Sequence, residues 1–108
     1  MHDTPPILPR LMALIEDRKV HRPPGSYTTQ LLDGGADEIG AKICEEAGEL
    51  VDAAQLADQA RQSVIHEAAD LIYHLLVLLA HCGTNLADVE AELDRRFGTS
   101  GLDEKAAR

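Results

Sequence analysis

Residues 64–80 read VIHEAADLIYHLLVLLA, and this stretch decides the fold class of the 108-residue chain. At about 100° per residue of an α-helix, Glu67, Asp70 and His74 fall within one sector of the helix surface. Apolar residues occupy most of the remaining circumference: Ile65, Ala68, Ala69, Leu71, Ile72, Leu75, Leu76, Leu78 and Leu79. A helix that is apolar over so much of its surface must be buried nearly all round. Because so short a chain has few helices to cover it, we predict that a second subunit completes the core.

The rest of the chain carries helical patterns separated by proline and glycine, with no alternating strand pattern of useful length. A linker over 20–25 precedes a short turn, which Ser26 caps and Gly34 ends. Helices are predicted over about residues 8–19, 37–57, 64–83 and 86–97. The predicted fold is therefore an all-α, small helical bundle of four to five helices in a single domain over residues 1–108. Its core is completed by oligomerisation, and residues 99–108 are expected to form a frayed tail.

Composition excludes several classes of function. The net charge is -9 and the aromatic share is 3%, which argues against nucleic-acid binding by a basic surface or by base stacking. The N-terminus lacks the pattern of a secretory signal, and the longest apolar run, 71–80, is about half of the roughly 20 residues that a membrane span needs. Cys44 and Cys82 form no CxxC pair, so we expect buried thiols without zinc or a disulfide framework. We expect a cytoplasmic protein with no nucleic-acid or membrane partner.

Carboxylates recur at helical spacing in two places. Glu45, Glu46 and Glu49 share a face beside an apolar stripe, and Glu67 and Asp70 lie three residues apart on the most apolar helix. Carboxylates at this spacing project about 5–6 Å apart, which suits two ligands of one hard cation such as Mg²⁺ or Mn²⁺. The Glu-x-x-His pairs of di-iron bundles are absent from the sequence. A solvated acidic face is the alternative, and the spacing alone leaves both interpretations open.

Three motifs in order carry a resemblance to a known family. They are PGSYT at 24–28, KxxEEAxE at 42–49 and EAADLIYHLLVLL at 67–79, with Gly34 between the first two. Together they resemble the phosphoribosyl-ATP pyrophosphatase family over about residues 18–97. The EExxE and ExxD elements are shared by the whole MazG-like superfamily of all-α nucleotide pyrophosphatases. The PGSYT segment, Lys42 and the DLIYHLLVLL run narrow the resemblance to the phosphoribosyl-ATP branch.

This resemblance implies an obligately oligomeric, cytoplasmic enzyme of histidine biosynthesis, a homodimer or a higher homo-oligomer. The implied reaction hydrolyses the α–β phosphoanhydride of 1-(5-phosphoribosyl)-ATP to 1-(5-phosphoribosyl)-AMP and pyrophosphate. Mg²⁺, or Mn²⁺ in its place, is the implied cofactor. The implied metal ligands are Glu46, Glu49, Glu67 and Asp70. Glu45 completes the implied catalytic set, as a ligand of a second ion or as the group that orients the attacking water.

Five further residues are candidate functional residues, and all of them except Lys42 also have a structural interpretation. Ser26, Tyr27 and Thr28 either cap and pack a helix or contact the phosphate or ribose of the substrate. Lys42 is assigned to the departing pyrophosphate. His74 is either a satisfied core residue or a support for the metal ligands. Two other functions stay open: a MazG-like pyrophosphatase of other (deoxy)nucleoside triphosphates, and a non-catalytic helical interaction module.

Overall fold

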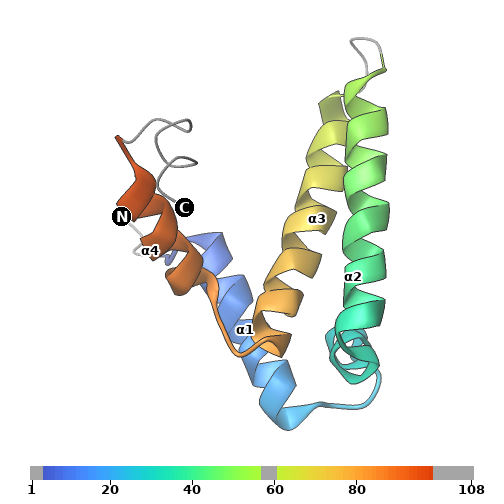
Figure 1. Cartoon of the computed structure of the whole chain (residues 1–108). Coiled ribbons are helices and arrows are strands. Elements are labelled where there is room, and N and C mark those ends of the chain that lie inside the picture. The colour runs from blue at the N-terminus through green and yellow to red at the C-terminus, as the bar shows by residue number, and fades with distance from the viewer. Residues whose placement is uncertain (1–3, 57–60, 99–108) are drawn as a thin grey trace.

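The computed structural model describes residues 4–56 and 61–98 and forms four helices in these two segments. They are α1 (Ile7–His21), α2 (Tyr27–Ala54), α3 (Arg61–His81) and α4 (Leu86–Arg96). The described residues include no strand. Helices α2 and α3 form an antiparallel hairpin, while α1 and α4 diverge from the hairpin above a shared base (Figure 1). The predicted all-α fold is confirmed.

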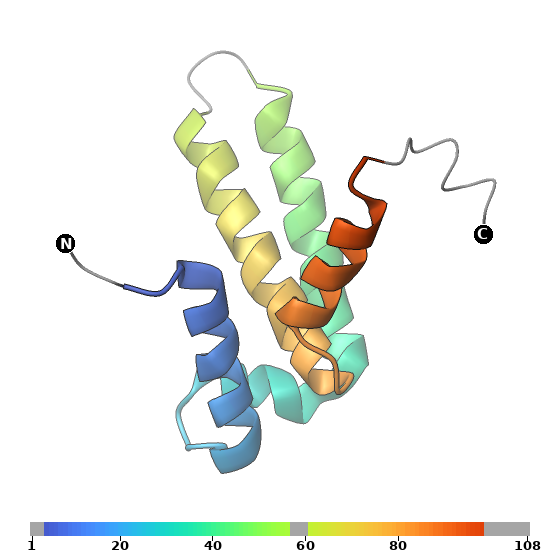
Figure 2. The same cartoon turned by 90° about the vertical axis from the view of Figure 1, so that its left-hand side faces the viewer.

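Helix α2 joins the predicted short turn and the predicted long helix into one kinked element. Ser26 is its N-cap, as predicted, and Ser26 Oγ accepts a hydrogen bond from the Thr29 N–H at 3.2 Å. The backbone leaves the helical region only at Gly35, where φ is 76° and ψ is -169°. The first turns of α2 therefore run across the foot of the molecule before the helix turns upward beside α3 (Figure 2). The predicted break is confirmed, because a short helical segment ends at Gly34 and the long segment resumes directly after Gly35, close to the predicted start near Asp37.

Replacing Gly35 by alanine is expected to destabilise the protein by about 1–3 kcal/mol, because its φ and ψ belong to a region that is essentially restricted to glycine. Gly48→Ala is the matched control within the same helix. A Cβ at Gly48 meets no atom within 4 Å, so this change is expected to stabilise by about 0.5–1 kcal/mol. Urea denaturation of the two variants measures both effects, and equal midpoints would contradict the role given to Gly35.

The other helix ends differ slightly from the predicted ones. Among the described residues, α3 extends back to Arg61, so Ser63 lies within the helix and is not its cap as predicted. Helix α2 ends at Ala54 with Gln55 as its C-cap, so it is shorter than the predicted helix to about residue 57, which itself lies outside the described residues. Helix α4 begins as predicted, after Asn85, which forms a reciprocal capping box with Asp88. The predicted tail over 99–108 also lies outside the described part of the chain.

The core occupies one end of the hairpin, where α1 meets the first half of α2 and the second half of α3. Its buried members are Met12, Ile15, Leu31, Leu32, Ile39, Leu76, Val77 and Ala80. Leu31 and Leu32 precede the kink and Ile39 follows it, so the turn at Gly35 brings both segments of α2 into one core. The core thereby fixes the register of α2 on α3 for the turns that follow, which carry the acidic residues.

Within one protomer, α3 is less buried than its pattern predicts. Ile65, Ile72 and Leu75 recur at helical spacing and remain exposed. Cys44 and Cys82 are exposed as well, so the prediction of buried thiols is wrong for the single chain. The reason is that the described helices cover only part of the hairpin, since α1 packs on α3 near its C-terminal end and α4 contacts α1.

Helix α3 is also long and apolar enough to cross a membrane by length and composition, with a mean hydropathy of 1.5 over its most apolar window. The core helix of a soluble bundle passes the same test. Glu67 and Asp70 lie within α3, and its largest interface is with α2. Carboxylates within a membrane-spanning segment are costly, so these features favour a bundle helix.

Candidate functional site

Three glutamates from two helices converge on the hairpin. Carboxylate oxygens of Glu46 and Glu49 on α2 and of Glu67 on α3 all lie within 4.8 Å of one another. Glu46 is only 6% exposed, and the Glu67 side chain is 17% exposed. The Oε2 atoms of Glu46 and Glu67 are buried and have no hydrogen-bond partner among the described residues. Buried, unpartnered carboxylate oxygens are costly, and oxygen ligands are those that Mg²⁺ and Mn²⁺ prefer, so this donor set fits a hard divalent cation.

The neighbouring acids change the titration of Glu67. Its pKa is raised from 4.5 to about 7, first because a protonated Glu67 can donate a hydrogen bond to Glu49, then by burial and because the same proton can be donated to Glu46. A proton held between carboxylates relieves the repulsion when no cation is bound. Binding of a metal ion at this cluster must therefore displace that proton.

The stability of the metal-free protein should consequently fall as the pH rises. The folded pKa of Glu67, about 7, lies above its ordinary value of 4.5, so folding favours the protonated form. The stabilising contribution is complete below the ordinary pKa and is lost as the pH rises through the folded pKa. We expect the melting temperature in a chelator to decrease between about pH 5 and about pH 8, and Glu67→Gln to flatten this dependence. If the melting temperatures of the wild type and of Glu67→Gln fell in parallel over this pH range, the raised pKa would not belong to Glu67.

Asp70 lies beside this cluster but has a different partner. Its Oδ2 atom is 3.3 Å from His66 Nε2, and His66, Glu67 and Asp70 form a second group of possible ligands within 4.8 Å. Glu67 belongs to both groups, so the two groups adjoin. Of the four predicted ligands, Glu46, Glu49 and Glu67 therefore converge on one point, and Asp70 lies beside them in the adjoining group. The sequence interpretation did not single out His66, although its i, i+4 spacing to Asp70 was a visible signal.

Lys42 and Glu45 form an ion pair on the exposed side of α2. Lys42 Nζ lies 3.4 Å from Glu45 Oε2, and the charge of Glu45 is the main cause of a raised pKa for Lys42. Glu45 does not belong to either group of possible ligands among the described residues. The pair leaves Lys42 charged and next to the carboxylates, where a positive group can offset the charge of a phosphorylated substrate.

The three hydroxyl residues at the start of α2 all have partners within the protein. Ser26 caps the Thr29 N–H, and the Tyr27 hydroxyl lies 2.9 Å from His74 Nε2. The Thr28 hydroxyl is hydrogen-bonded to the hydroxyl of Tyr73, a residue that the sequence interpretation did not select. The Tyr27 and Tyr73 rings stack with centroids 6.1 Å apart. These contacts attach the first turn of α2 to α3, one helical turn beyond Asp70.

His74 is a buried residue with both ring nitrogens occupied. Its Nδ1 atom lies 2.7 Å from the backbone oxygen of Asp70, and its Nε2 atom faces the Tyr27 hydroxyl. His74 is thus a satisfied core residue that also joins Tyr27 to the backbone at Asp70. The interpretation of His74 as a satisfied core residue is therefore confirmed, while its support of metal ligands stays a prediction.

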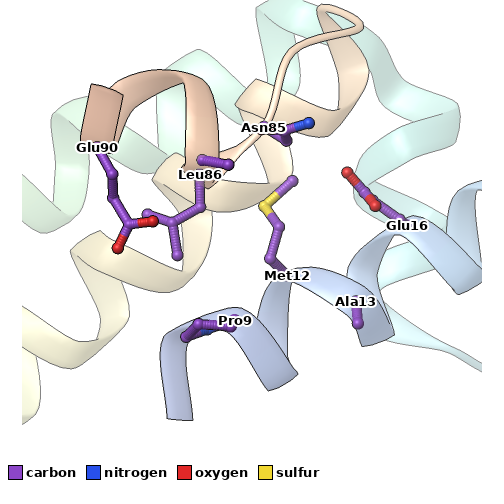
Figure 3. A pocket seen from close by; sticks show the side chains of 8 residues that line it. Pro9, Met12, Ala13, Glu16, Asn85, Leu86 and Glu90 are labelled. Carbon is purple, nitrogen blue, oxygen red and sulfur yellow. The ribbon is translucent and has the colours of Figure 1, made fainter. Parts of the chain in front are cut away.

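Two hollows lie away from these residues. One of about 200 Å³ lies between α1 and α4, and its lining includes Met12 of α1 and Leu86 of α4 (Figure 3). A second, of about 410 Å³, adjoins it beside Lys19 and Ala80. Neither hollow is lined by Glu46, Glu49, Glu67 or Asp70.

Comparison with known proteins gives a consistent result. Residues 8–97 match the family model described as phosphoribosyl-ATP pyrophosphohydrolase. The chain is 58% identical over 102 residues to a phosphoribosyl-ATP pyrophosphatase of Rhodopirellula baltica, covering 94% of this chain and 85% of the relative. It is 52% identical over 101 residues to the protein of that name in Rhizorhabdus wittichii, with coverage of 94% and 93%. A third relative of the same name, in Nitrosospira multiformis, is 50% identical over 104 residues, with coverage of 96% and 84%.

Proposed function

Because the chain belongs to the phosphoribosyl-ATP pyrophosphohydrolase family, we propose that it catalyses the second step of histidine biosynthesis. The substrate is 1-(5-phosphoribosyl)-ATP, and water cleaves its α–β phosphoanhydride to give 1-(5-phosphoribosyl)-AMP and pyrophosphate. The observation that carries the proposal is the convergence of Glu46, Glu49 and Glu67 within a chain of this family. In a helix that only binds a partner protein, buried carboxylate oxygens without hydrogen bonds would cost stability and serve no function.

We propose a divalent cation, Mg²⁺ or Mn²⁺, as the cofactor, held by Glu46, Glu49 and Glu67 with Asp70 beside them. When bound, the ion neutralises triphosphate oxygens and activates water. Glu46 supplies a buried ligand whose position α2 fixes, and Glu67 links the α2 acids to Asp70. For Asp70 to join the same ion, its carboxylate must leave His66.

The remaining predicted residues act on the substrate. Lys42 lies beside Glu45 and supplies positive charge for the departing pyrophosphate. Glu45 is exposed and outside the ligand group, which suits a role in orienting the attacking water. The first turn of α2 packs on α3 through Tyr27 and Thr28, next to the turn that carries Asp70. With Ser26 it would contact the phosphate or the ribose of the substrate.

A homodimer or a higher homo-oligomer is proposed from the exposed apolar stripe of Ile65, Ile72 and Leu75 on α3. A second copy covering this stripe would remove its apolar side chains from water. Light scattering after gel filtration should give a mass of at least twice 11.7 kDa, and a monomer at micromolar concentration would contradict the proposal. A cytoplasmic location follows from the proposed biosynthetic role.

Product analysis tests the reaction itself. Incubation with phosphoribosyl-ATP and Mg²⁺, followed by ion-exchange chromatography, should yield phosphoribosyl-AMP and pyrophosphate in equal amounts. Chelation of the metal should stop the reaction, and added Mg²⁺ or Mn²⁺ should restore it. Release of orthophosphate, or undiminished activity in the chelator, would contradict the proposed bond cleavage or the proposed cofactor.

A further inference from the structure

The hydrogen bonds around His74 determine where the proton of the Tyr27 hydroxyl lies. A backbone carbonyl only accepts, so the contact of His74 Nδ1 with the Asp70 oxygen at 2.7 Å requires a proton on Nδ1. A neutral imidazole has a single N–H, and its Nε2 atom is therefore an acceptor. To a neutral His74, the Tyr27 hydroxyl, 2.9 Å from Nε2, donates its proton.

This arrangement leaves the Tyr27 oxygen as an acceptor only. The hydroxyl proton is donated to His74, whereas the lone pairs of the oxygen can still accept hydrogen bonds. Tyr27 is 46% exposed, so a ligand can reach it. Burial is the largest of the effects that raise the pKa of Tyr27, which keeps the phenol protonated. Phosphate oxygens also act only as hydrogen-bond acceptors at neutral pH. Tyr27 could therefore donate a hydrogen bond to a phosphate only by breaking its hydrogen bond to His74. A partner for Tyr27 must itself be a donor.

The position of Tyr27 decides which donor of the substrate can reach it. The Tyr27 phenol is close enough to Lys42, Glu45 and Glu46 for their charges to act on it. Through His74 it is also tied to the backbone of α3 at Asp70. A helical turn rises about 5.4 Å, so Tyr27 lies within a short distance of the carboxylates where the triphosphate would lie. The groups next to a nucleoside triphosphate chain that carry O–H donors are the sugar hydroxyls.

We propose that Tyr27 is a specificity residue that accepts a hydrogen bond from a sugar hydroxyl of the substrate, and that His74 sets this preference by holding the Tyr27 proton. This inference rests on the proposed function and narrows it. The sequence left phosphate and ribose open as partners of the PGSYT segment. The directions of the two hydrogen bonds on His74 select the ribose for Tyr27.

The test compares phosphoribosyl-ATP with four analogues, each lacking one sugar hydroxyl, at about pH 8 with saturating Mg²⁺. The wild-type protein should show kcat/KM lowered about tenfold for at least one analogue, the size expected for one lost hydrogen bond. Tyr27→Phe should lower kcat/KM for the full substrate by about the same factor and should no longer distinguish that analogue. Tyr73→Phe, the matched control on the neighbouring ring, should keep the wild-type ratio.

The possible results separate this inference from the proposed function. If the wild-type protein hydrolyses phosphoribosyl-ATP but treats all four analogues alike, Tyr27 has no hydroxyl partner and the inference is wrong. Retention of the wild-type ratio in Tyr27→Phe would overturn it equally. If the wild-type protein releases no pyrophosphate from the full substrate, the proposed function itself fails. The wild-type ratios need no variant, so poor folding of Tyr27→Phe would not prevent the decision.

Discussion

Glu46→Gln is expected to lower turnover about a thousandfold or more while the helix content stays at the wild-type level. Glu46 is the most buried of the three converging glutamates, and its Oε2 atom has no partner among the described residues. Glutamine keeps the shape but removes the charge that a divalent cation requires. A bound metal contributes several kcal/mol to transition-state stabilisation, and each 1.4 kcal/mol, roughly, is a factor of ten in rate. Steady-state pyrophosphate release and circular dichroism measure the two quantities.

The same substitution should have opposite effects on stability with and without metal. In a chelator, Glu46→Gln should raise the melting temperature by a few degrees, because it removes repulsion among Glu46, Glu49 and Glu67. In Mg²⁺ the wild-type protein should gain stability and the variant should not. Asp52→Asn, an exposed residue later on α2, is the matched control and should behave like the wild type in both conditions. If Glu46→Gln kept full turnover, Glu46 would not be a ligand of the metal ion.

Ile39→Ala is expected to destabilise the protein by about 2–5 kcal/mol, the range for large-to-small changes in a packed core. Ile39 is fully buried, and it is the first core residue of α2 after the kink at Gly35. The loss is a large share of the roughly 5–15 kcal/mol that stabilises a small domain. Urea denaturation in Mg²⁺ and in a chelator measures the change, and the metal should recover part of it by binding only the folded state.

Val20→Ala serves as the control for this prediction. Val20 is an apolar residue on α1 that is largely exposed, so its truncation should change stability by less than about 0.5 kcal/mol. Similar costs at Ile39 and Val20 would mean that the core is not centred on the Gly35 kink.

The sequence predicted the helices well because their signals are local. The Asn85 cap, the glycines that follow α3 and α4 and the periodic apolar residues of α3 each depend on neighbours within a few turns. The break within α2 also had a local signal, because Gly34 and Gly35 follow each other in the sequence. The direction in which the chain turns there was not predictable, because it depends on the packing of Leu31 and Leu32 with Ile39. Such packing joins different helices and has no local signature.

The candidate site was predicted in part for the same reason. Helical spacing placed Glu46 and Glu49 on one face, and the resemblance to the family paired them with Glu67. Spacing within one helix could not decide whether Asp70 pairs with His66 or with the α2 acids. Nor could it reveal the bond between Tyr27 and His74, because their contact depends on the register of α2 against α3 across 47 residues.

Pyrophosphate release with Mg²⁺, measured side by side on phosphoribosyl-ATP, ATP, dCTP and dUTP, tests the central claim most directly. The account predicts that kcat/KM for phosphoribosyl-ATP exceeds that for each of the other three by about a hundredfold or more, since a site that binds the extra sugar rejects substrates lacking it. Preference for ATP, dCTP or dUTP would contradict the assignment to histidine biosynthesis and leave a general nucleotide pyrophosphatase. No release from any of the four by the folded, metal-loaded protein would contradict the enzymatic function altogether.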